Sequence, residues 1–496
     1  MEKLSPKNNN KVHFIGIGGI GTSALARWFL SCGYDVSGSD INLSEIISEL
    51  KKQGVKVFIG HRPENLAKEI QLVIYSAAVP FNNPEFQKAK KLGIPIKSYA
   101  EALGDLSKKY KTFAVSGAHG KSTTTALLSL ILIRNGFDPT VIIGTKLKEF
   151  NPPAGGSNFR KGKSNYLILE ADEYNHSFLN YSPFAAIILN IDKEHLDSYK
   201  NLADIKKTFL KFINNIQPNG ILIVNKDDKN LFSLKDKIQK IVKNKNIELL
   251  WYGITNSSDR QNLLYLRKTL KISGESGNVN RDALLGEHNV SNALAAYTLA
   301  KALKIKDRNI FSAIGSYRGA WRRMEYKGEF KIQSSKFKVK VYDDYAHHPT
   351  EIKATLAGIA QKSPKTGIIC VFQPHQVKRL KALFKEFVGA FDAANALILL
   401  PIYQVAGRDP STSLRASKVS QNVNSKQLAE AIKNRVVKLK TQDSRLKTVV
   451  CLPHPEKLPS ILEKIIHVSC FKFHASCIVV MMGAGDIYKM TDKLIR

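Results

Sequence analysis

The sequence has few cysteines, and no two of them form a CxxC pair. An odd number of cysteines without such spacing is typical of thiols that stay reduced and pack as small apolar side chains. The pattern excludes a small disulfide scaffold. We expect five buried thiols in a reducing compartment, at positions 32, 370, 451, 470 and 477.

Long apolar runs are also missing. The first eleven residues are polar and lack the apolar core of a signal peptide. No stretch approaches the roughly 18 consecutive apolar residues that a membrane-spanning helix requires. The sequence therefore predicts no membrane span and a cytoplasmic location.

Acidic residues are scarce. Asp and Glu number 42 against 75 Lys and Arg, so the formal net charge is +33. Such a charge favours anionic partners, although compositional drift alone also produces lysine-rich surfaces. No five basic residues are consecutive, and no aromatic residues interleave with them as in single-strand binders. We therefore expect phosphorylated small molecules, and no nucleic acid, as partners.

The chain has 496 residues, 43% of them hydrophobic, which is too long for one core and predicts three domains. In three successive sets, short runs rich in Val and Ile alternate with helix-like segments. This alternation is typical of parallel sheets in an α/β fold. The expected domains span residues 1–108, 109–317 and 318–496.

The predicted strands are short and apolar. In the first domain they lie at 12–16, 35–38, 55–59 and 72–76. In the second they lie at 113–116, 141–143, 166–169, 185–189 and 221–224, and 235–245 is expected to form an exposed helix and loop. In the third they lie at 339–342, 368–372, 396–400, 449–452 and 477–482, with loops at 409–425 and 442–447.

A glycine motif, Gly16-Ile-Gly-Gly-Ile-Gly21, follows the first predicted strand and opens a helix. Glycines there permit a tight turn, and the helix N-terminus offers free N–H groups to a phosphate. Asp40 ends the second strand, where an acid can accept a ribose hydroxyl. The motif predicts diphosphate binding; glycines that only allow close packing are the alternative. A single mononucleotide-binding half favours a nucleotide sugar over NAD.

A second loop, Gly117-Ala-His-Gly120-Lys121-Ser122, also lies between a strand and a helix. Its lysine can reach terminal phosphate oxygens, and its serine hydroxyl can bind Mg²⁺. The loop is two residues shorter than the usual P-loop spacing, but its context favours ATP. The strand at 166–169 then runs into Glu170-Ala-Asp-Glu173, which supplies hard oxygen ligands for Mg²⁺.

Further polar clusters follow other predicted strands or open helices. His195 lies in the cluster 190–197 and is either a second metal ligand or a surface residue. Asn289 and Asn292 precede or open a helix and can contact adenine or cap that helix. In the third domain, polar residues at 343–349 and 373–379 follow strands, where parallel sheets bind ligands.

Together these motifs resemble those of the Mur ligase family, the amide ligases that build peptidoglycan. The resemblance covers nearly the whole chain, in the order GxGGxG, GxHGKS, EADE, NxxxEHLD, GxHNxxN, RR, DDYxHHPTE and FQPH. It implies an N-terminal Rossmann-like domain for UDP-N-acetylmuramate and a central P-loop ATPase-type domain for ATP and two Mg²⁺ ions. A C-terminal Rossmann-like domain would bind the amino acid.

Within the family, the segment 343–351 and the FQPH motif are most similar to the branch that joins L-alanine to UDP-N-acetylmuramate through an acyl phosphate. The branch that joins a preformed murein tripeptide usually has an arginine-containing segment in place of FQPH, and it is the alternative. Gln376 stands where many members of the first branch have an arginine. We expect a monomer or a homodimer.

The resemblance implies a role for each matching residue. Catalytic roles fall on Lys121, Glu173, His195, Arg323 and His348. ATP contacts fall on Gly117, Ala118, His119, Gly120, Lys121, Ser122, Thr123, Asn289, Asn292, Arg323 and Asp343. UDP-sugar contacts fall on Gly16, Gly18, Gly19, Ile20, Gly21, Asp40 and Ser76. Amino-acid contacts fall on Tyr345, His347, His348, His375 and Arg379, and the metal ligands are Ser122, Glu173 and His195.

Two unrelated functions were weighed against this one. A nicotinamide-dependent oxidoreductase explains only the glycine motif and leaves the other motifs without a role. An ATP-dependent nucleic-acid binder would explain the charge of +33, but the sequence contains no recognisable nucleic-acid module.

Overall fold

The structure is a computed structural model that describes residues 10–495, except 152–154, 196–197, 256–259, 273–283, 285, 333–337, 405–422, 439–443 and 470–476. The described chain forms two compact units. The first consists of Met1–Thr269 and Ser291–Tyr317, and the second of Leu270–Val290 and Arg318–Arg496. Leu196 and Asp197 of the predicted cluster, and most of the predicted loop at 409–425, lie outside the described residues.

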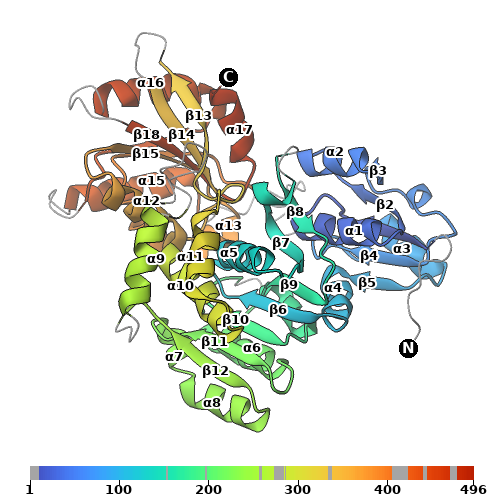
Figure 1. Ribbon diagram of the computed structural model, residues 1–496. Coiled ribbons are helices and arrows are strands. Elements are labelled where there is room, and N and C mark those ends of the chain that lie inside the picture. Colours follow the sequence, from blue (N-terminus) through green and yellow to red (C-terminus); the bar gives the residue numbers. More distant parts are fainter. Residues whose placement is uncertain are drawn as a thin grey trace. The chain divides into compact units, whose positions relative to one another are not determined.

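The first unit begins with a five-stranded parallel sheet in the order β3-β2-β1-β4-β5 (Figure 1). Its strands are β1 (Lys11–Ile15), β2 (Asp35–Asp40), β3 (Lys56–Ile59), β4 (Leu72–Tyr75) and β5 (Ile96–Ser98). Side chains alternate between the two faces. Val12 and Phe14 pack in one core with α1 (Ile20–Ser31), α2 (Glu45–Lys52) and α4 (Tyr99–Ser107). Ile15 packs on the other face, with α3 (Pro84–Lys91).

The same unit contains a seven-stranded sheet in the order β12-β11-β10-β6-β9-β7-β8, of which only β8 is antiparallel to its neighbour. Its strands are β6 (Lys111–Ser116), β7 (Thr140–Leu147), β8 (Ser157–Arg160), β9 (Tyr166–Ala171), β10 (Ala185–Ile188), β11 (Ile221–Asn225) and β12 (Glu248–Tyr252). Because the central strands β9, β10 and β11 are largely apolar, helices cover both faces.

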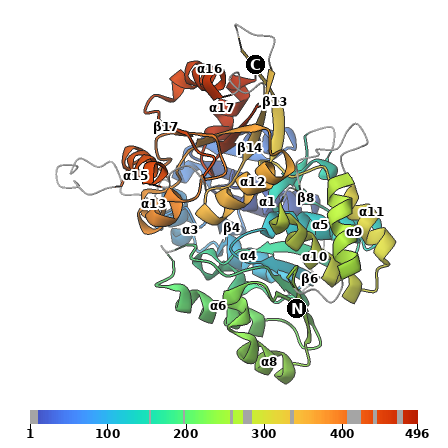
Figure 2. The ribbon, with the colours of Figure 1, turned by 90° about the vertical axis from the view of Figure 1, so that its left-hand side faces the viewer.

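Helices α6 (Leu202–Asn214) and α8 (Lys235–Asn244) cover one face of this second sheet. The buried helix α5 (Lys121–Arg134) packs against β7 and β9. It also contacts α11 (Asp307–Gly315), which lies beside α9 (Arg260–Ile272) and α10 (Glu287–Ala302) (Figures 1 and 2). Short helix α7 (Lys229–Phe232) follows β11.

The second unit is built on a six-stranded sheet in the order β13-β14-β18-β15-β16-β17, with only β13 antiparallel. Its strands are β13 (Glu325–Lys331), β14 (Lys338–Asp344), β15 (Gly367–Phe372), β16 (Ala396–Leu399), β17 (Thr448–Cys451) and β18 (Cys477–Met482). One face packs under α12 (Pro349–Lys362), α13 (Val377–Ala382), α14 (Phe384–Val388) and α15 (Ser425–Lys438). The other packs under α16 (Leu458–Ser469) and α17 (Ile487–Leu494).

The expected α/β class with mainly parallel sheets is confirmed, and each predicted strand coincides with an observed one. Residues 235–244 form the expected exposed helix α8. The expectation of five buried, reduced thiols is confirmed for Cys370 and is wrong for Cys477, which is disulfide-bonded. Cys32 and Cys451 are free but only partly buried, and Cys470 lies outside the described residues.

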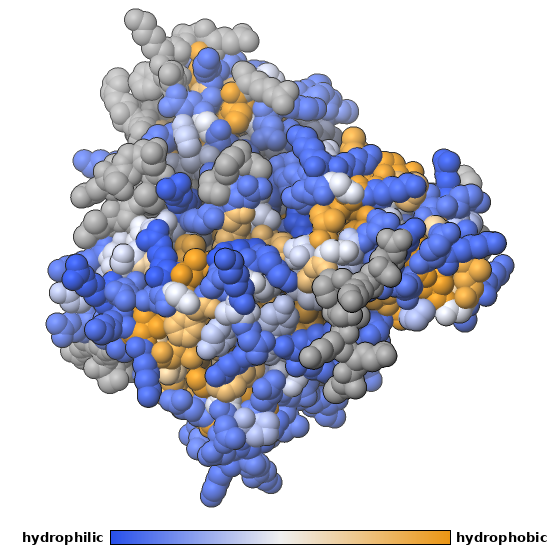
Figure 3. Space-filling view, turned by 45° about the vertical axis from the view of Figure 1, so that its right-hand side comes forward, coloured by the Kyte–Doolittle hydropathy of each residue, from blue (hydrophilic) through white to orange (hydrophobic). Residues whose placement is uncertain are grey.

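Hydrophilic side chains cover most of the face drawn in Figure 3, as the large excess of lysine leads one to expect. None of the helices in the described part of the chain combines the length and apolar character that crossing a membrane demands.

Candidate active site

The glycine motif forms a tight loop between β1 and α1. Gly16 has a φ of +79°, in the left-handed region that favours glycine. A Cβ on Gly18 would lie 2.9 Å from a carboxylate oxygen of Asp40, and one on Gly21 would lie 2.9 Å from the ring of Tyr99. The glycines therefore have packing roles within the fold as well as the conformational freedom that a phosphate cradle requires.

Asp40, at the end of β2, accepts hydrogen bonds from two backbone N–H groups. Its Oδ2 accepts a hydrogen bond from the backbone N–H of Gly18 at 2.8 Å, and its Oδ1 accepts one from the N–H of Ile41 at 2.8 Å. Ser76 directly follows β4, which flanks β1 on the other side, and it lies against Gly16. The structure thus brings Asp40 and Ser76 together with the glycine loop.

The second loop follows β6 and leads into α5. Gly117 and Gly120 both have positive φ, +137° and +86°. A Cβ on Gly120 would lie only 2.3 Å from Oδ1 of Asn292 on α10, so the loop backbone and this buried amide are in close contact. Such a glycine loop at a helix N-terminus can surround a phosphate with backbone N–H groups.

Lys121, the first residue of α5, points back across this loop. Its Nζ donates to the carbonyl oxygen of Gly117 at 2.7 Å and to Glu173 Oε2 at 3.0 Å, and it lies 3.7 Å from Asp172 Oδ1. Burial lowers the pKa of Lys121, but the carboxylates of Glu173, Asp172 and Glu170 outweigh burial and raise the pKa above its ordinary value. The lysine is therefore a permanent cation at the loop.

Ser122, in the first turn of α5, contacts the carboxylate of Glu170. Its hydroxyl donates to Oε2 of Glu170 at 3.2 Å, and the other oxygen of Glu170 accepts from the N–H of Gly144 at 2.7 Å. Glu170 belongs to the segment 170–173 that the sequence predicts to supply oxygen ligands for Mg²⁺, although the resemblance implied only Glu173 as a metal ligand. Glu170 is the last-but-one residue of β9, which places it beside α5.

Glu173 forms a second polar group with Asp172 and His195. One ligand atom from each of the three lies within 4.8 Å of the others, as in a metal site. Glu173 is 2% exposed, and its Oε1 has no hydrogen-bond partner among the described residues, although His195 Nε2 lies 3.7 Å away. An unsatisfied buried carboxylate oxygen is costly, which makes this atom a natural ligand for a cation. Asp172 was predicted only as part of the acidic segment 170–173, and the resemblance did not name it as a metal ligand.

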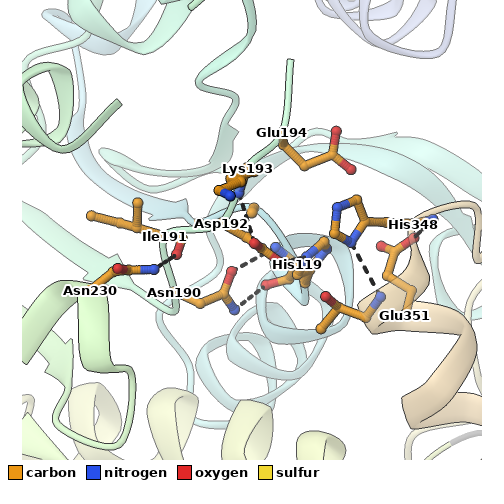
Figure 4. Close-up of polar contacts among 12 residues, drawn as sticks. His119, Asn190, Ile191, Asp192, Lys193, Glu194, Asn230, His348 and Glu351 are labelled. Atoms are coloured by element: carbon orange, nitrogen blue, oxygen red, sulfur yellow. Dashed lines mark hydrogen bonds and ion pairs between the residues drawn. The ribbon is translucent and has the colours of Figure 1, made fainter. Parts of the chain in front are cut away.

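His119 is held by the loop after β10, as Figure 4 shows. Its backbone N–H donates to Oδ1 of Asn190 at 2.8 Å, and its carbonyl oxygen accepts from Nδ2 of the same asparagine at 3.0 Å. Its ring Nε2 lies 3.0 Å from Asp192 Oδ2. The side chain of Asn190 therefore fixes the loop by binding the backbone of His119. The sequence indicated only that Asn190 follows a predicted strand.

In the second unit, Arg322 and Asp343 form a buried pair, with Nε and Oδ1 3.3 Å apart. The guanidinium also donates to the carbonyl oxygens of Gly483 and Gly485. Burial raises the pKa of Asp343 to about 7 even though Arg322 opposes the rise. Asp343 is fully buried beside this guanidinium.

Arg323, Tyr345, His347 and His348 lie together around Glu351 at the start of α12. Arg323 stacks over the ring of Tyr345 at 5.2 Å. Oε2 of Glu351 lies 3.2 Å from Nδ1 of His347 and accepts from the backbone N–H of His348 at 3.4 Å. His348 caps the helix through its side chain (Figure 4).

His375 and Arg379 also lie together, at the start of α13. His375 Nδ1 is 3.1 Å from Nη1 of Arg379, and its ring stacks on Tyr403 with centroids 5.6 Å apart. The rings of His347 and His375 are 5.9 Å apart, so the two predicted amino-acid segments meet in this unit. Tyr403 was not predicted.

Three family models match consecutive parts of the chain: "Mur ligase family, catalytic domain" over residues 11–111, "Mur ligase middle domain" over 115–300 and "Mur ligase, glutamate ligase domain" over 322–456. A UDP-N-acetylmuramate–L-alanine ligase from Clostridium kluyveri is 42% identical over 98% of this chain and 97% of its own. The chain belongs to the Mur ligase family.

Solved structures agree with this assignment. The crystal structure of the UDP-N-acetylmuramate–alanine ligase MurC from Thermotoga maritima aligns over 98% of both chains, with a TM-score of 0.71 and 25% identity. A murein peptide ligase from Psychrobacter arcticus, 22% identical, shares the fold over 98% of both chains with a TM-score of 0.63.

Proposed function

We propose that the protein joins L-alanine to the lactyl carboxylate of UDP-N-acetylmuramate at the expense of ATP. One observation carries the proposal. At the glycine loop 117–122, Lys121 contacts the carboxylate of Glu173 and Ser122 contacts that of Glu170. Full-length similarity to L-alanine ligases supports this choice of substrates. The reaction would take place in the cytoplasm, where ATP and nucleotide sugars are available.

In the first unit, the loop 16–21 would hold the diphosphate of UDP-N-acetylmuramate, with Asp40 and Ser76 beside it. The loop 117–123 would hold the phosphates of ATP, because it has two positive-φ glycines and leads into the N-terminus of α5, where backbone N–H groups favour an anion. Lys121 would then turn from Glu173 toward the terminal phosphate.

The donor sets of the first unit fit two Mg²⁺ ions, which prefer oxygen ligands and phosphate. Ser122 and Glu170 would hold one ion, and Glu173, Asp172 and His195 the other. The unsatisfied Oε1 of Glu173 supports the second site. When bound, Mg²⁺ neutralises negative charge on the phosphates of ATP.

Arg323 of the second unit offers a partly exposed guanidinium for the γ-phosphate. We assign Asn289 and Asn292 on α10, together with Asp343, to the nucleoside. His375 and Arg379 offer adjacent donors for the carboxylate of L-alanine, a geometry in which a guanidinium is effective. Tyr345, His347 and His348 would line the same amino-acid site.

A carboxylate is unreactive toward an amine, so the acid is activated first. An oxygen of the lactyl carboxylate attacks the γ-phosphorus, the bond to ADP breaks, and an acyl phosphate forms. The amine of L-alanine then attacks the acyl carbon, loses a proton, and inorganic phosphate leaves. Lys121 and Arg323 would stabilise the charge of the transferring phosphoryl group.

A murein tripeptide ligase is the second candidate, since a protein of this kind shares the fold. Phosphate release with ATP, Mg²⁺ and UDP-N-acetylmuramate separates the two. Release that requires added L-alanine supports the proposal. Release that requires L-Ala-D-Glu-diaminopimelate instead would overturn it. A separate measurement, light scattering on the same preparation, would distinguish a monomer from a homodimer.

A further inference from the structure

A buried ionic cluster joins the first sheet of the first unit to its second sheet. Arg27 on α1 and Lys146 on β7 are 5% and 4% exposed. Lys146 Nζ donates to Glu45 at 2.6 Å and to Glu49 at 2.9 Å, both on α2. A charge buried to this degree is stable only with its partners in place, so β7 is held firmly against α2.

Glu49 is shared by the two cations. Arg27 Nη2 donates to Glu49 Oε2 at 2.8 Å, and its Nε donates to Gln53 at 3.1 Å. Burial lowers the pKa of Arg27, while Glu49 opposes this fall. The cluster therefore tolerates neither the loss of Glu49 nor a displacement of β7.

Asn158 connects the cluster to the glycine loop. It lies on β8, the partner strand of β7, and is fully buried. Its Nδ2 donates to the carbonyl oxygen of Ile20 at 2.5 Å and to Ser23 Oγ at 2.9 Å, and its Oδ1 accepts from Arg27 at 2.5 Å. Ile20 is both the first residue of α1 and a member of the loop 16–21.

Strands β7 and β8 pair as an antiparallel hairpin, and this hairpin is also connected to the second loop, residues 117–122. Gly144 of β7 donates to Glu170, whose second oxygen accepts from Ser122 in the first turn of α5. A side chain at Gly144 would place its Cβ 2.8 Å from Glu170, so the approach is close. One two-stranded element thus contacts the glycine loop through Asn158 and the P-loop through Glu170.

We propose that the β7–β8 hairpin sets the spacing between the two substrate loops, and that Asn158 is the positioning residue that holds the glycine loop to it. This inference rests on the proposed function. Since the lactyl carboxylate must meet the γ-phosphate of ATP within about 3 Å, a displaced glycine loop would lower turnover as well as substrate affinity.

The test is Asn158→Asp in the full chain. The carboxylate still accepts from Arg27 but cannot donate to Ile20 or Ser23. Calorimetric titration should give a Kd for UDP-N-acetylmuramate about tenfold higher, as expected for the loss of one or two buried hydrogen bonds. The Kd of a non-hydrolysable ATP analogue with Mg²⁺ should stay within twofold, and kcat should fall. Gln53→Ala, which removes a contact of Arg27 confined to α1 and α2, should change neither affinity.

A role of Asn158 in folding alone would lower the active fraction without changing either Kd, and an unchanged Kd for UDP-N-acetylmuramate would overturn the inference. Equal weakening of both ligands would also overturn it. Should Asn158→Asp fail to fold, Lys146→Met breaks the same connection at β7 and must raise the same Kd. Wild-type protein that binds the ATP analogue but not UDP-N-acetylmuramate would instead refute the proposed function.

Discussion

Ser122 donates its hydroxyl hydrogen to Glu170 across 3.2 Å, which links the first turn of α5 to the end of β9. A serine hydroxyl and a carboxylate at this distance can ligate one hard cation together. Under the proposed function, Glu170 and Ser122 would hold one cation, and Glu173 would hold the other with Asp172 and His195.

Glu170→Gln should therefore weaken the response to Mg²⁺. The amide keeps the size of the side chain but removes the charge, so the Mg²⁺ concentration for half-maximal activity should rise at least about tenfold. A Mg²⁺ titration of phosphate release measures the effect. Glu64→Gln, on the exposed surface, is the control, and a wild-type Mg²⁺ requirement in Glu170→Gln would exclude this ligand.

Lys121→Met should lower turnover by about 10²–10³-fold, the usual effect of losing one charged stabilising donor, and should leave UDP-sugar binding intact. It also leaves Glu173 buried without its cation partner, at 2% exposure. We expect a cost of about 3–5 kcal/mol in the free energy of unfolding.

The double variant Lys121→Met/Glu173→Gln separates the two effects, because it removes the unpaired charge as well. Chemical denaturation should show recovered stability while phosphate release stays low. Substantial ligase activity in Lys121→Met would overturn the assignment of the lysine to ATP.

The strands and the two glycine loops could be predicted because apolar runs and glycine spacing are local signals. The edge strands β5, β8, β12 and β13 were not predicted, since half-exposed strands carry a mixed pattern. Partners within the site were harder still. That Ser122 meets Glu170, and that Asn190 holds His119, depends on which strands are neighbours in the sheet, here β6 between β9 and β10.

The same limit applies to the paired arginines. Both were visible in the sequence, but only the fold shows that Arg322 is buried and bound to carbonyl oxygens while Arg323 stays partly exposed. Asp343 likewise follows a strand as expected, yet its burial beside Arg322 depends on β14 lying between β13 and β18.

Gly120→Ala should be much more harmful than Gly136→Ala. Both glycines have nearly the same φ, +86° and +80°, so the backbone strain of about 1–2 kcal/mol is shared. Only at Gly120 does the new Cβ collide, at 2.3 Å from Asn292; at Gly136 no atom lies within 4 Å.

Denaturation and ATP-analogue binding measure the comparison. Gly136→Ala should lose stability only, whereas Gly120→Ala should also lose nucleotide affinity. Equal effects of the two substitutions would mean that the contact between the loop and Asn292 is unimportant.

Asp343→Asn should change how stability depends on pH. Burial raises the pKa of Asp343 from 3.8 to about 7, so the folded protein holds a proton between these values that the unfolded chain has lost. The wild-type free energy of unfolding should therefore contain a contribution that is full below pH 4 and is lost as pH rises to 7, about 1.4 kcal/mol for each pKa unit. Asparagine resembles the protonated acid and does not titrate, so this decline should be absent from the variant.

Urea denaturation from pH 4.5 to pH 8 tests this difference between wild type and Asp343→Asn, with Asp236→Asn on the exposed face of α8 as the control. If wild type and Asp343→Asn show parallel pH profiles, Asp343 is ionised throughout this range in the folded protein.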